Sequence, residues 1–181
     1  MTIRAFPALI LLALACAPST GQDVRDKKED GKETAKNERF EQFKQLAGEW
    51  VGKPQGKDDM EIRVIYKVTA GGSAVAETLF PGTDHEMVTV IHRDGDDLLL
   101  THYCHLGNQP QMKAPGKRDG NSVAFKFVRA TNLKSDKDPH MHDATYTFVD
   151  NDTFRTEWTL YQDGKSASVF LFDLKRKQAD K

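Results

Sequence analysis

Length and charge narrow the class of protein before any motif is considered. The chain has 181 residues, with 26 Lys and Arg against 27 Asp and Glu and a formal net charge of -1. It therefore lacks the basic surface that nucleic-acid binding requires, and we expect no nucleic-acid partner. The length predicts a single folded domain.

The N-terminal segment is typical of an export signal. Residues 1–15 carry one charged side chain, Arg4, before an apolar run that is too short to span a bilayer. Ala15 and Cys16 resemble the end of the lipobox of bacterial lipoproteins, although the two residues before them depart from that motif. We expect a signal peptide and export to the periplasm or the bacterial envelope. Two outcomes stay open for Cys16: a lipid that attaches the protein to a membrane, or simple cleavage.

A polar segment separates the signal from the domain. Residues 16–36 are mixed in charge and free of aromatic side chains, which is typical of a disordered, solvated tether. The folded domain is then expected over residues 37–177. It begins with a short amphipathic helix from Asn37 to Leu46, which ends before Gly48.

From the helix onward, apolar residues recur with a period of two. Turn signals such as Asp94-Gly95, Asp119-Gly120 and Asp163-Gly164 interrupt this pattern at regular intervals. The pattern predicts about ten antiparallel strands that are linked mainly by tight turns. Their expected ranges are Glu49 to Lys53, Met60 to Thr69, Ser73 to Phe80, Glu86 to Arg93, Asp97 to His105, Gln109 to Ala114, Ser122 to Ala130, His142 to Val149, Thr153 to Gln162 and Ala167 to Lys175.

Each predicted strand has one apolar face, so the strands must close or stack to cover their edges. The one connection long enough for a crossover runs from Asn132 to Met141, which favours closure over a sandwich. We therefore predict an all-β fold: an up-and-down antiparallel β-barrel with one short N-terminal helix. Its exterior is expected to carry mostly Lys, Arg, Glu and Thr, for example Arg63, Lys67 and Lys126.

Two short blocks carry a resemblance. Gly48, Trp50 and Gly52 form a Gly-x-Trp-x-Gly pattern directly after the predicted helix. This start resembles that of calycin-like barrels, which include lipocalins, fatty-acid-binding proteins and nitrobindin-type haem barrels. A second block, Leu100-Thr101-His102-Tyr103-Cys104 with Gly107-Asn108-Gln109-Pro110, resembles one found in uncharacterised exported bacterial proteins. The calycin resemblance implies a ligand in the barrel lumen, or haem at its mouth.

Haem is disfavoured, and no cofactor is identified. Nitrobindin-type barrels carry their iron-ligating histidine late in the chain, whereas the last predicted strand, Ala167 to Lys175, has none. The apolar inward faces instead indicate a lumen for a small, mainly apolar ligand, with Trp50 closing its base. The expected ligand-binding residues are Trp50, Tyr66, Ile91, Leu100, His102, Cys104, Phe125, Phe127, Arg129, Trp158 and Phe170.

His102 and Cys104 share one face of a predicted strand, which invites a Cys-His catalytic interpretation. Residues two apart on a strand are separated by roughly 6.5 to 7 Å, which exceeds hydrogen-bond reach. The ordinary interpretation is a buried thiol without a disulfide partner, beside an imidazole that a neighbouring strand satisfies. That interpretation is compatible with His102 lining a ligand site.

Three further residues have a functional and an ordinary interpretation. His140 and His142 have the spacing at which two imidazoles on a strand bind one metal ion, but a stable zinc site needs a third ligand. The polar residues Asp136 to Pro139 favour two solvated histidines beside an exposed loop. Arg129 falls at the end of the inward face that includes Phe125. It either neutralises an acidic ligand at the barrel mouth or extends to solvent at the rim.

Binding of a small apolar ligand is the favoured function, and two alternatives stay open. A metal-dependent or thiol enzyme requires His102, Cys104, His140 and His142 to converge on one site. A structural envelope protein with a filled barrel requires an apolar patch on its outer face for partners. The sequence leaves the oligomeric state open.

Overall fold

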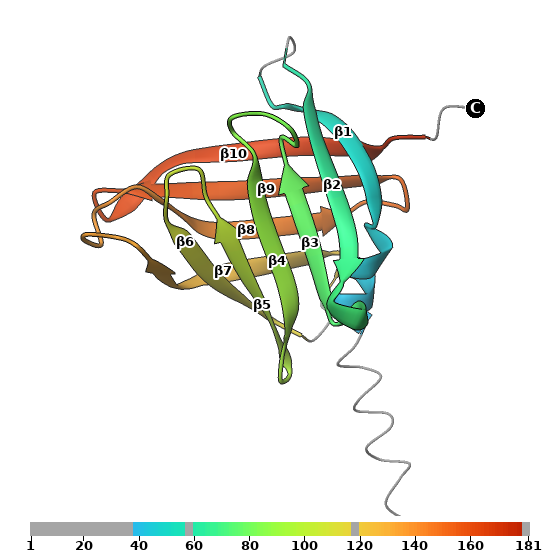
Figure 1. Cartoon of the computed structure of the whole chain (residues 1–181), viewed down its shortest axis with the longest axis horizontal. Coiled ribbons are helices and arrows are strands. Elements are labelled where there is room, and N and C mark those ends of the chain that lie inside the picture. The colour runs from blue at the N-terminus through green and yellow to red at the C-terminus, as the bar shows by residue number, and fades with distance from the viewer. Residues whose placement is uncertain (1–37, 57–59, 117–119, 179–181) are drawn as a thin grey trace, which may run out of the picture.

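The structure of the protein is a computed structural model that describes residues 38–56, 60–116 and 120–178 (Figure 1). The predicted signal peptide, Cys16 and the tether lie outside the described residues. Within the described ranges, no helix combines the length and the apolar character that crossing a lipid bilayer requires.

Ten antiparallel strands close into one barrel, which confirms the predicted fold class. Each strand pairs with its neighbours in the chain, and β1 also pairs with β10, for example at Trp50 and Arg176. Closure gives both outermost strands of the meander a pairing partner. The strands are β1 (Gly48–Pro54), β2 (Ile62–Thr69), β3 (Ala74–Leu79), β4 (Met87–Asp94), β5 (Asp97–Tyr103), β6 (Gln109–Pro115), β7 (Ser122–Thr131), β8 (His140–Phe148), β9 (Thr153–Gln162) and β10 (Lys165–Arg176).

One end of the barrel, here called the closed end, is covered by the helix of residues 38–45 (Figure 1). Phe40 and Phe43 lie three residues apart on one face of this helix, and both are buried, as the amphipathic pattern predicts. The Phe43 ring meets those of Phe125 and Tyr146 edge to face, at centroid distances of 5.9 and 5.2 Å. The helix is therefore part of the core.

The Gly-x-Trp-x-Gly pattern of β1 has a packing explanation. A Cβ atom on Gly52 would lie 2.0 Å from the carbonyl oxygen of Asp173 on β10, and Gly48 has a φ of +131°. Trp50, between them, is fully buried, and its Nε1 donates a hydrogen bond of 2.7 Å to the Leu46 carbonyl. Trp50 thus lies at the closed end, where the sequence predicts it.

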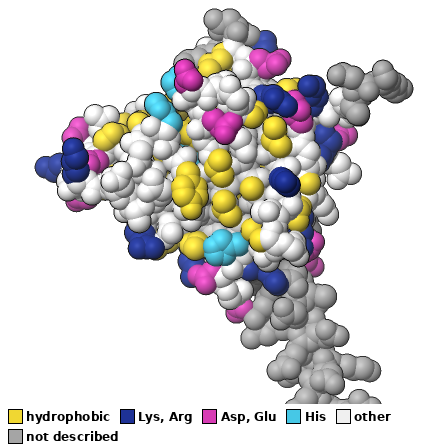
Figure 2. Space-filling model, viewed as in Figure 1, with side chains coloured by type: hydrophobic (Ala, Val, Ile, Leu, Met, Phe, Trp, Pro, Cys, Tyr) yellow, Lys and Arg dark blue, Asp and Glu magenta, His cyan; other side chains and the backbone are white. Residues whose placement is uncertain are grey.

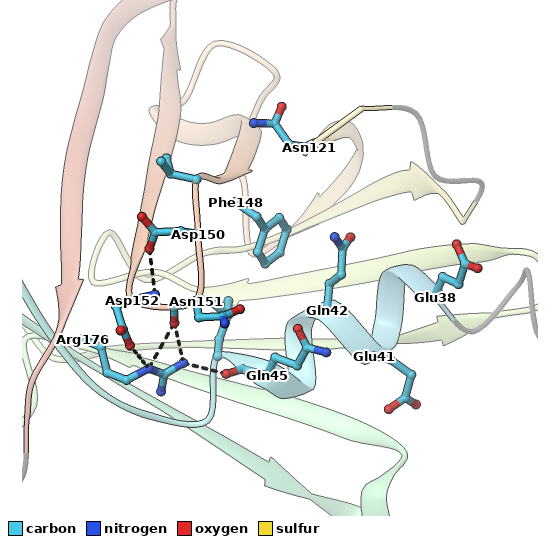
Figure 3. Close-up of a pocket in the computed structure, with 12 residues that line it drawn as sticks. Glu38, Glu41, Gln42, Gln45, Asn121, Phe148, Asp150, Asn151, Asp152 and Arg176 are labelled. Atoms are coloured by element: carbon cyan, nitrogen blue, oxygen red, sulfur yellow. Dashed lines mark hydrogen bonds and ion pairs between the residues drawn. The ribbon is translucent and has the colours of Figure 1, made fainter.

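Arg176 contacts the helix, β1 and the β8–β9 turn at the closed end (Figure 3). Its guanidinium lies 4.2 Å from the centroid of the Trp50 ring. It donates hydrogen bonds of 2.8 Å to the Gln45 carbonyl, 2.9 Å to the Ala47 carbonyl and 3.2 Å to the Asn151 carbonyl. The polar groove beside it, of about 950 Å³, lies between the helix and this turn. These contacts give Arg176 a structural role.

The opposite end of the barrel is here called the mouth. Odd-numbered strands start at the closed end, so β5 ends at the mouth, just before Cys104, and β10 begins there. Phe170 of β10 lies opposite the buried Trp158 in the register and so shares its inward face. Phe170 is nevertheless 40% exposed. The mouth is therefore open to solvent at Phe170.

The outer face over β2 to β5 is apolar, so the expectation of a mainly charged exterior is wrong there (Figure 2). Val88 lies opposite Tyr103, and Ala76 lies opposite Val90. The cause is that apolar side chains lie on both faces of these strands: β5 contains the run Leu98 to Leu100, and β4 has Val88 and Val90 on its outer face. An apolar outer patch is what the structural-protein alternative requires. The patch consists of Ile65, Ala76, Val88, Val90, Leu99 and Tyr103.

Candidate functional site

The half of the lumen next to the closed end is filled by protein side chains. The Phe154 ring lies 4.6 Å from that of Trp50 and 5.6 Å from that of Tyr66, centroid to centroid, and all three residues are buried. Phe125 lies against Phe43 of the helix. Trp50, Tyr66 and Phe125, which the sequence places in the ligand site, therefore belong to close-packed core.

A row of polar side chains crosses the inner wall between the core and the mouth. Glu77 of β3 lies opposite Thr89 of β4, and Thr89 lies opposite His102 of β5. All three are buried. Tyr66 and Tyr146 donate hydrogen bonds of 2.9 and 2.8 Å to the two carboxylate oxygens of Glu77, and Thr89 also hydrogen-bonds to this carboxylate. The row is thus a connected network.

Burial shifts the protonation of this network. It raises the pKa of Glu77 to about 7, although the hydrogen bonds from Tyr146, Tyr66 and Thr89 act in the opposite direction. Burial lowers the pKa of His102 to about 4. Burial, together with the charge of Glu77, raises the pKa values of Tyr66 and Tyr146 well above the ordinary value. His102 is therefore neutral at pH 7, and both tyrosines are hydrogen-bond donors.

Above the pKa of Glu77, about 7, where its carboxyl is ionised, the network sets the tautomer of His102. An ionised Glu77 only accepts hydrogen bonds, so Thr89 donates its single proton to the carboxylate. The Thr89 oxygen then accepts from His102 Nδ1, 2.9 Å away. His102 Nε2 is left as an unprotonated acceptor. This atom is buried and has no partner among the described residues.

Trp158 supplies a second unpaired group beside His102. The two ring centroids are 4.8 Å apart, and Trp158 Nε1 is likewise buried without a partner in the described part of the chain. Indole nitrogen only donates hydrogen bonds. Two neighbouring rings on the inner wall therefore carry an acceptor, His102 Nε2, and a donor, Trp158 Nε1–H.

Apolar side chains continue from this pair. Ile91 lies opposite Leu100, and both are fully buried. Phe172, two residues after the exposed Phe170 on the same inward face, is also buried. Of the residues expected to bind ligand, His102, Trp158, Ile91, Leu100 and Phe170 thus lie on the inner face of the barrel.

Cys104 is a buried free thiol at the end of β5. Burial raises its pKa, which opposes thiolate formation. His102 Nδ1 is bonded to Thr89 instead of facing the thiol. In the described ranges no group of three or more His, Cys, Asp and Glu side chains could hold a metal ion. The convergence that the enzyme alternative requires is therefore not found among these residues.

A register shift changes the position of Arg129. The pairing of β6 with β7 moves from Met112–Phe127 to Gln111–Arg129, so one additional residue, Val128, separates the two pairs. Arg129 is exposed and donates a hydrogen bond of 2.8 Å to Gln111. The expectation that Arg129 continues the inward face is wrong, because the bulge reverses the alternation. Phe127 is half-buried.

His140 and His142 are not solvated loop residues, which corrects the sequence-based expectation. β8 begins at His140, which pairs with Tyr161 of β9, and a further register shift lies between Met141 and Asp143. His140 is 4% exposed, and His142 is half-buried. The long connection is correspondingly shorter than expected and covers residues 132–139.

Sequence reasoning missed Glu77, Thr89 and Tyr146. A signal for Glu77 was present, because it alternates with Val75 and Leu79, which both face inward. An acidic residue at an inward position of a strand is a candidate for a buried network. Its partners could not be identified, because Tyr146 lies 69 residues away in the chain.

The fold and this inner wall define a closed, ten-stranded antiparallel β-barrel with a polar network in its lumen. Neither the models of known protein families nor the curated proteins include a match to the sequence. The fold is similar to the crystal structure of Rv2717c from M. tuberculosis, with a TM-score of 0.55, 14% sequence identity, and coverage of 78% of this chain and 98% of that chain.

A second similar structure is a protein of unknown function from the DUF3598 family of Nostoc punctiforme. Its TM-score is 0.48 and its identity 15%, over 75% of this chain and 49% of that chain. At these identities the likeness concerns the fold alone. The haem implied by the nitrobindin resemblance does not fit the residues present, because β10 (Lys165–Arg176) contains no histidine.

Proposed function

We propose that the protein binds a small, mainly apolar molecule in the half of the lumen next to the mouth. One observation carries the proposal: the rings of His102 and Trp158 lie 4.8 Å apart, centroid to centroid, and His102 Nε2 and Trp158 Nε1 are each buried and without partners among the described residues. Buried polar atoms are nearly always paired, and each unpaired one costs about 1–3 kcal/mol. A ligand that pairs both atoms recovers this energy.

The acceptor and donor define the head group of the ligand. A hydroxyl group complements them, because its proton goes to His102 Nε2 and its oxygen accepts from Trp158 Nε1–H. The nearby carboxylate of Glu77 disfavours an anionic head group. Ile91 and Leu100 belong to the apolar core of the inner face, and a ligand at the mouth would cover Phe170, which is 40% exposed. The proposed ligand is thus a neutral, largely apolar alcohol.

The proposal includes a calycin-like fold family and a localisation in the bacterial envelope. The Gly48-Trp50-Gly52 pattern supports a calycin-like carrier, and the likeness of residues 1–15 to an export signal supports delivery to the bacterial envelope. Fractionation of host cells that produce the wild type or Cys16→Ser tests this localisation. A lipoprotein moves from the membrane to the soluble fraction in this variant, whereas a cleaved periplasmic protein is soluble in both forms.

Titration of the 15N-labelled protein with 1-octanol tests the site by NMR. The chain has two tryptophans. Among the described residues, the indole N–H of Trp158 has no partner, whereas that of Trp50 is bonded to the Leu46 carbonyl. We expect a saturable shift of the Trp158 signal, an unmoved Trp50 signal, and binding about tenfold weaker for octyl methyl ether, which cannot donate to His102.

Paired histidine variants complete this test. His102→Phe is expected to abolish the preference for the alcohol over the ether, whereas His92→Phe, on the outer side of β4, is expected to retain it. Absence of a saturable shift, or equal shifts of both indole signals, would contradict the proposal.

A further inference from the structure

A cleft interrupts the barrel wall between β7 and β8. These strands pair only from Ser122–Thr147 to Phe125–Ala144. Beyond this point β7 continues alongside β6, and β8 continues alongside β9, each with a register shift. The cleft between the diverging strands has a volume of about 610 Å³ and is lined in part by Phe127, His140 and Tyr161. This volume lies within the range of small-molecule sites.

One wall of the cleft is a stack of flat rings. The His142 ring lies between Phe127, at a centroid distance of 4.5 Å and an angle of 19°, and Tyr161, at 3.7 Å and 16°. His140 is tilted by 40° against Phe127 at 4.9 Å. Both faces of the His142 ring are covered within this stack, so only its edge is left for a ligand, and a planar aromatic ligand favours such an edge-to-face contact.

His140 adds a buried acceptor to the cleft. Its Nδ1 lies 2.8 Å from the Asp138 carbonyl, which can only accept a hydrogen bond, so Nδ1 carries the proton. In the neutral imidazole, Nε2 is then the acceptor. This atom is buried and has no partner in the described part of the chain, and His140 as a whole is 4% exposed. A ligand hydroxyl or N–H group would satisfy it.

Arg129 adds a positive charge to the same cleft. Its one hydrogen bond among the described residues goes to the neutral side chain of Gln111, so its charge has no carboxylate partner there. Guanidinium groups bind carboxylates through two parallel hydrogen bonds. Asp136 also lines the cleft and disfavours a second negative charge on the ligand.

We propose that this cleft binds a planar aromatic monocarboxylate that carries a hydroxyl group. The rings of Phe127, His142 and Tyr161 contact its aromatic system, Arg129 pairs with its carboxylate, and His140 Nε2 accepts from its hydroxyl. The lining of the cleft includes neither His102 nor Trp158, so this site is independent of the one proposed in the lumen.

The probe for the test is 6-hydroxy-2-naphthoate, titrated calorimetrically into the full chain. Two analogues report on each end of the molecule: 6-hydroxy-2-naphthamide lacks the charge, and 6-methoxy-2-naphthoate lacks the donor. Arg129→Gln is expected to weaken binding of the naphthoate about tenfold and to leave binding of the naphthamide nearly unchanged. His140→Phe is expected to remove the preference for hydroxyl over methoxy.

Two controls keep the proposal falsifiable. Lys67→Gln removes an exposed positive charge on β2 and is expected to leave all three affinities unchanged. Arg129 is exposed, so its substitution leaves the core intact even where His140→Phe unfolds the protein. No binding of the naphthoate at about millimolar concentration, an equal loss for acid and amide in Arg129→Gln, or binding of Zn²⁺ in place of the naphthoate would overturn the proposal.

Discussion

The indole of Trp158 lies 4.8 Å from the imidazole of His102, and each ring carries a buried nitrogen without a partner among the described residues. When Glu77 is ionised, one nitrogen donates and the other accepts, because Thr89 then holds the proton of His102 on Nδ1. The pair therefore matches a hydroxyl group better than a carboxylate or an ammonium group. The preference is set by Glu77, two residues further along the network.

The carboxyl of Glu77 is expected to make stability depend on pH. Its pKa in the folded protein is about 7, against an ordinary 4.5, so the folded state retains a proton that the unfolded chain releases. Stability from this group falls as pH rises from 4.5 to 7, by about 3 kcal/mol. Glu77→Gln removes this loss. Urea titrations measure the free energy of unfolding of both proteins. The difference, variant minus wild type, should increase by about 3 kcal/mol as the pH rises from 4.5 to 7.

Comparison between variant and wild type isolates this effect. His102, with its pKa lowered from 6.5 to about 4, acts in the opposite direction, because its stabilisation grows as pH rises from 4 to 6.5 and is lost below that range. It contributes equally to both proteins and cancels in the difference. Glu157→Gln, an exposed glutamate on β9, serves as the control. A difference between Glu77→Gln and wild type that is constant with pH would show that Glu77 is not held in this network.

Gly52 is expected to tolerate no side chain. A Cβ atom there meets the Asp173 carbonyl oxygen at 2.0 Å, so Gly52→Ala must push β1 and β10 apart, at a cost of about 3 kcal/mol or more. Gly95→Ala is the matched control, because Gly95 has a φ of +61° and open space around it. It should cost about 1 kcal/mol. Equal losses in chemical denaturation would refute the close approach of the two strands.

Arg176 is expected to stabilise the closed end through the geometry of its guanidinium. Arg176→Lys retains the charge but loses the fork that reaches the carbonyls of Gln45 and Ala47, and should lower the free energy of unfolding by about 2 kcal/mol. Arg155→Lys, at an exposed ion pair with Asp173, should cost less than about 0.5 kcal/mol. Similar losses for both variants would assign the effect to charge alone.

Cys104 is expected to react slowly with thiol reagents while the protein is folded. In a Cys16→Ser variant it is the single thiol, since the chain has two cysteines. Burial raises its pKa, so modification by an aromatic disulfide at pH 8 should be about a hundredfold slower than in denaturant, or more. Fast, stoichiometric reaction of the folded protein would instead favour the thiol-enzyme alternative.

The barrel could be predicted because its signals are local. The alternation of apolar and polar residues along strands such as Ile62–Thr69 can be recognised from neighbouring residues in the chain, and so can the regular turns. These patterns predicted the strand number and the closure, and the helical spacing of apolar residues predicted the helix. The apolar outer face was missed although the run Leu98-Leu99-Leu100 places Leu99 opposite to its neighbours. Such a run indicates a strand that is apolar on both sides.

The candidate site was only partly predictable, because its key features are not local. His102 and Trp158 were named from strand parity, but their contact joins β5 to β9. The cleft depends on register shifts beside Arg129 and Met141, and a bulge leaves little trace in sequence alternation. Parity therefore placed Arg129 on the wrong face, and the polar loop before His140 concealed the burial of that histidine.

Native mass spectrometry of the protein, purified from its own host without detergent, tests ligand binding in the lumen most directly. We expect each barrel to carry one additional small molecule, lost on denaturation and recovered in the organic extract as a neutral, largely apolar compound with a hydroxyl group. Protein that is bare in every preparation, and that gains no mass when incubated with a lipid extract of the host, would contradict a carrier and favour a filled, structural barrel.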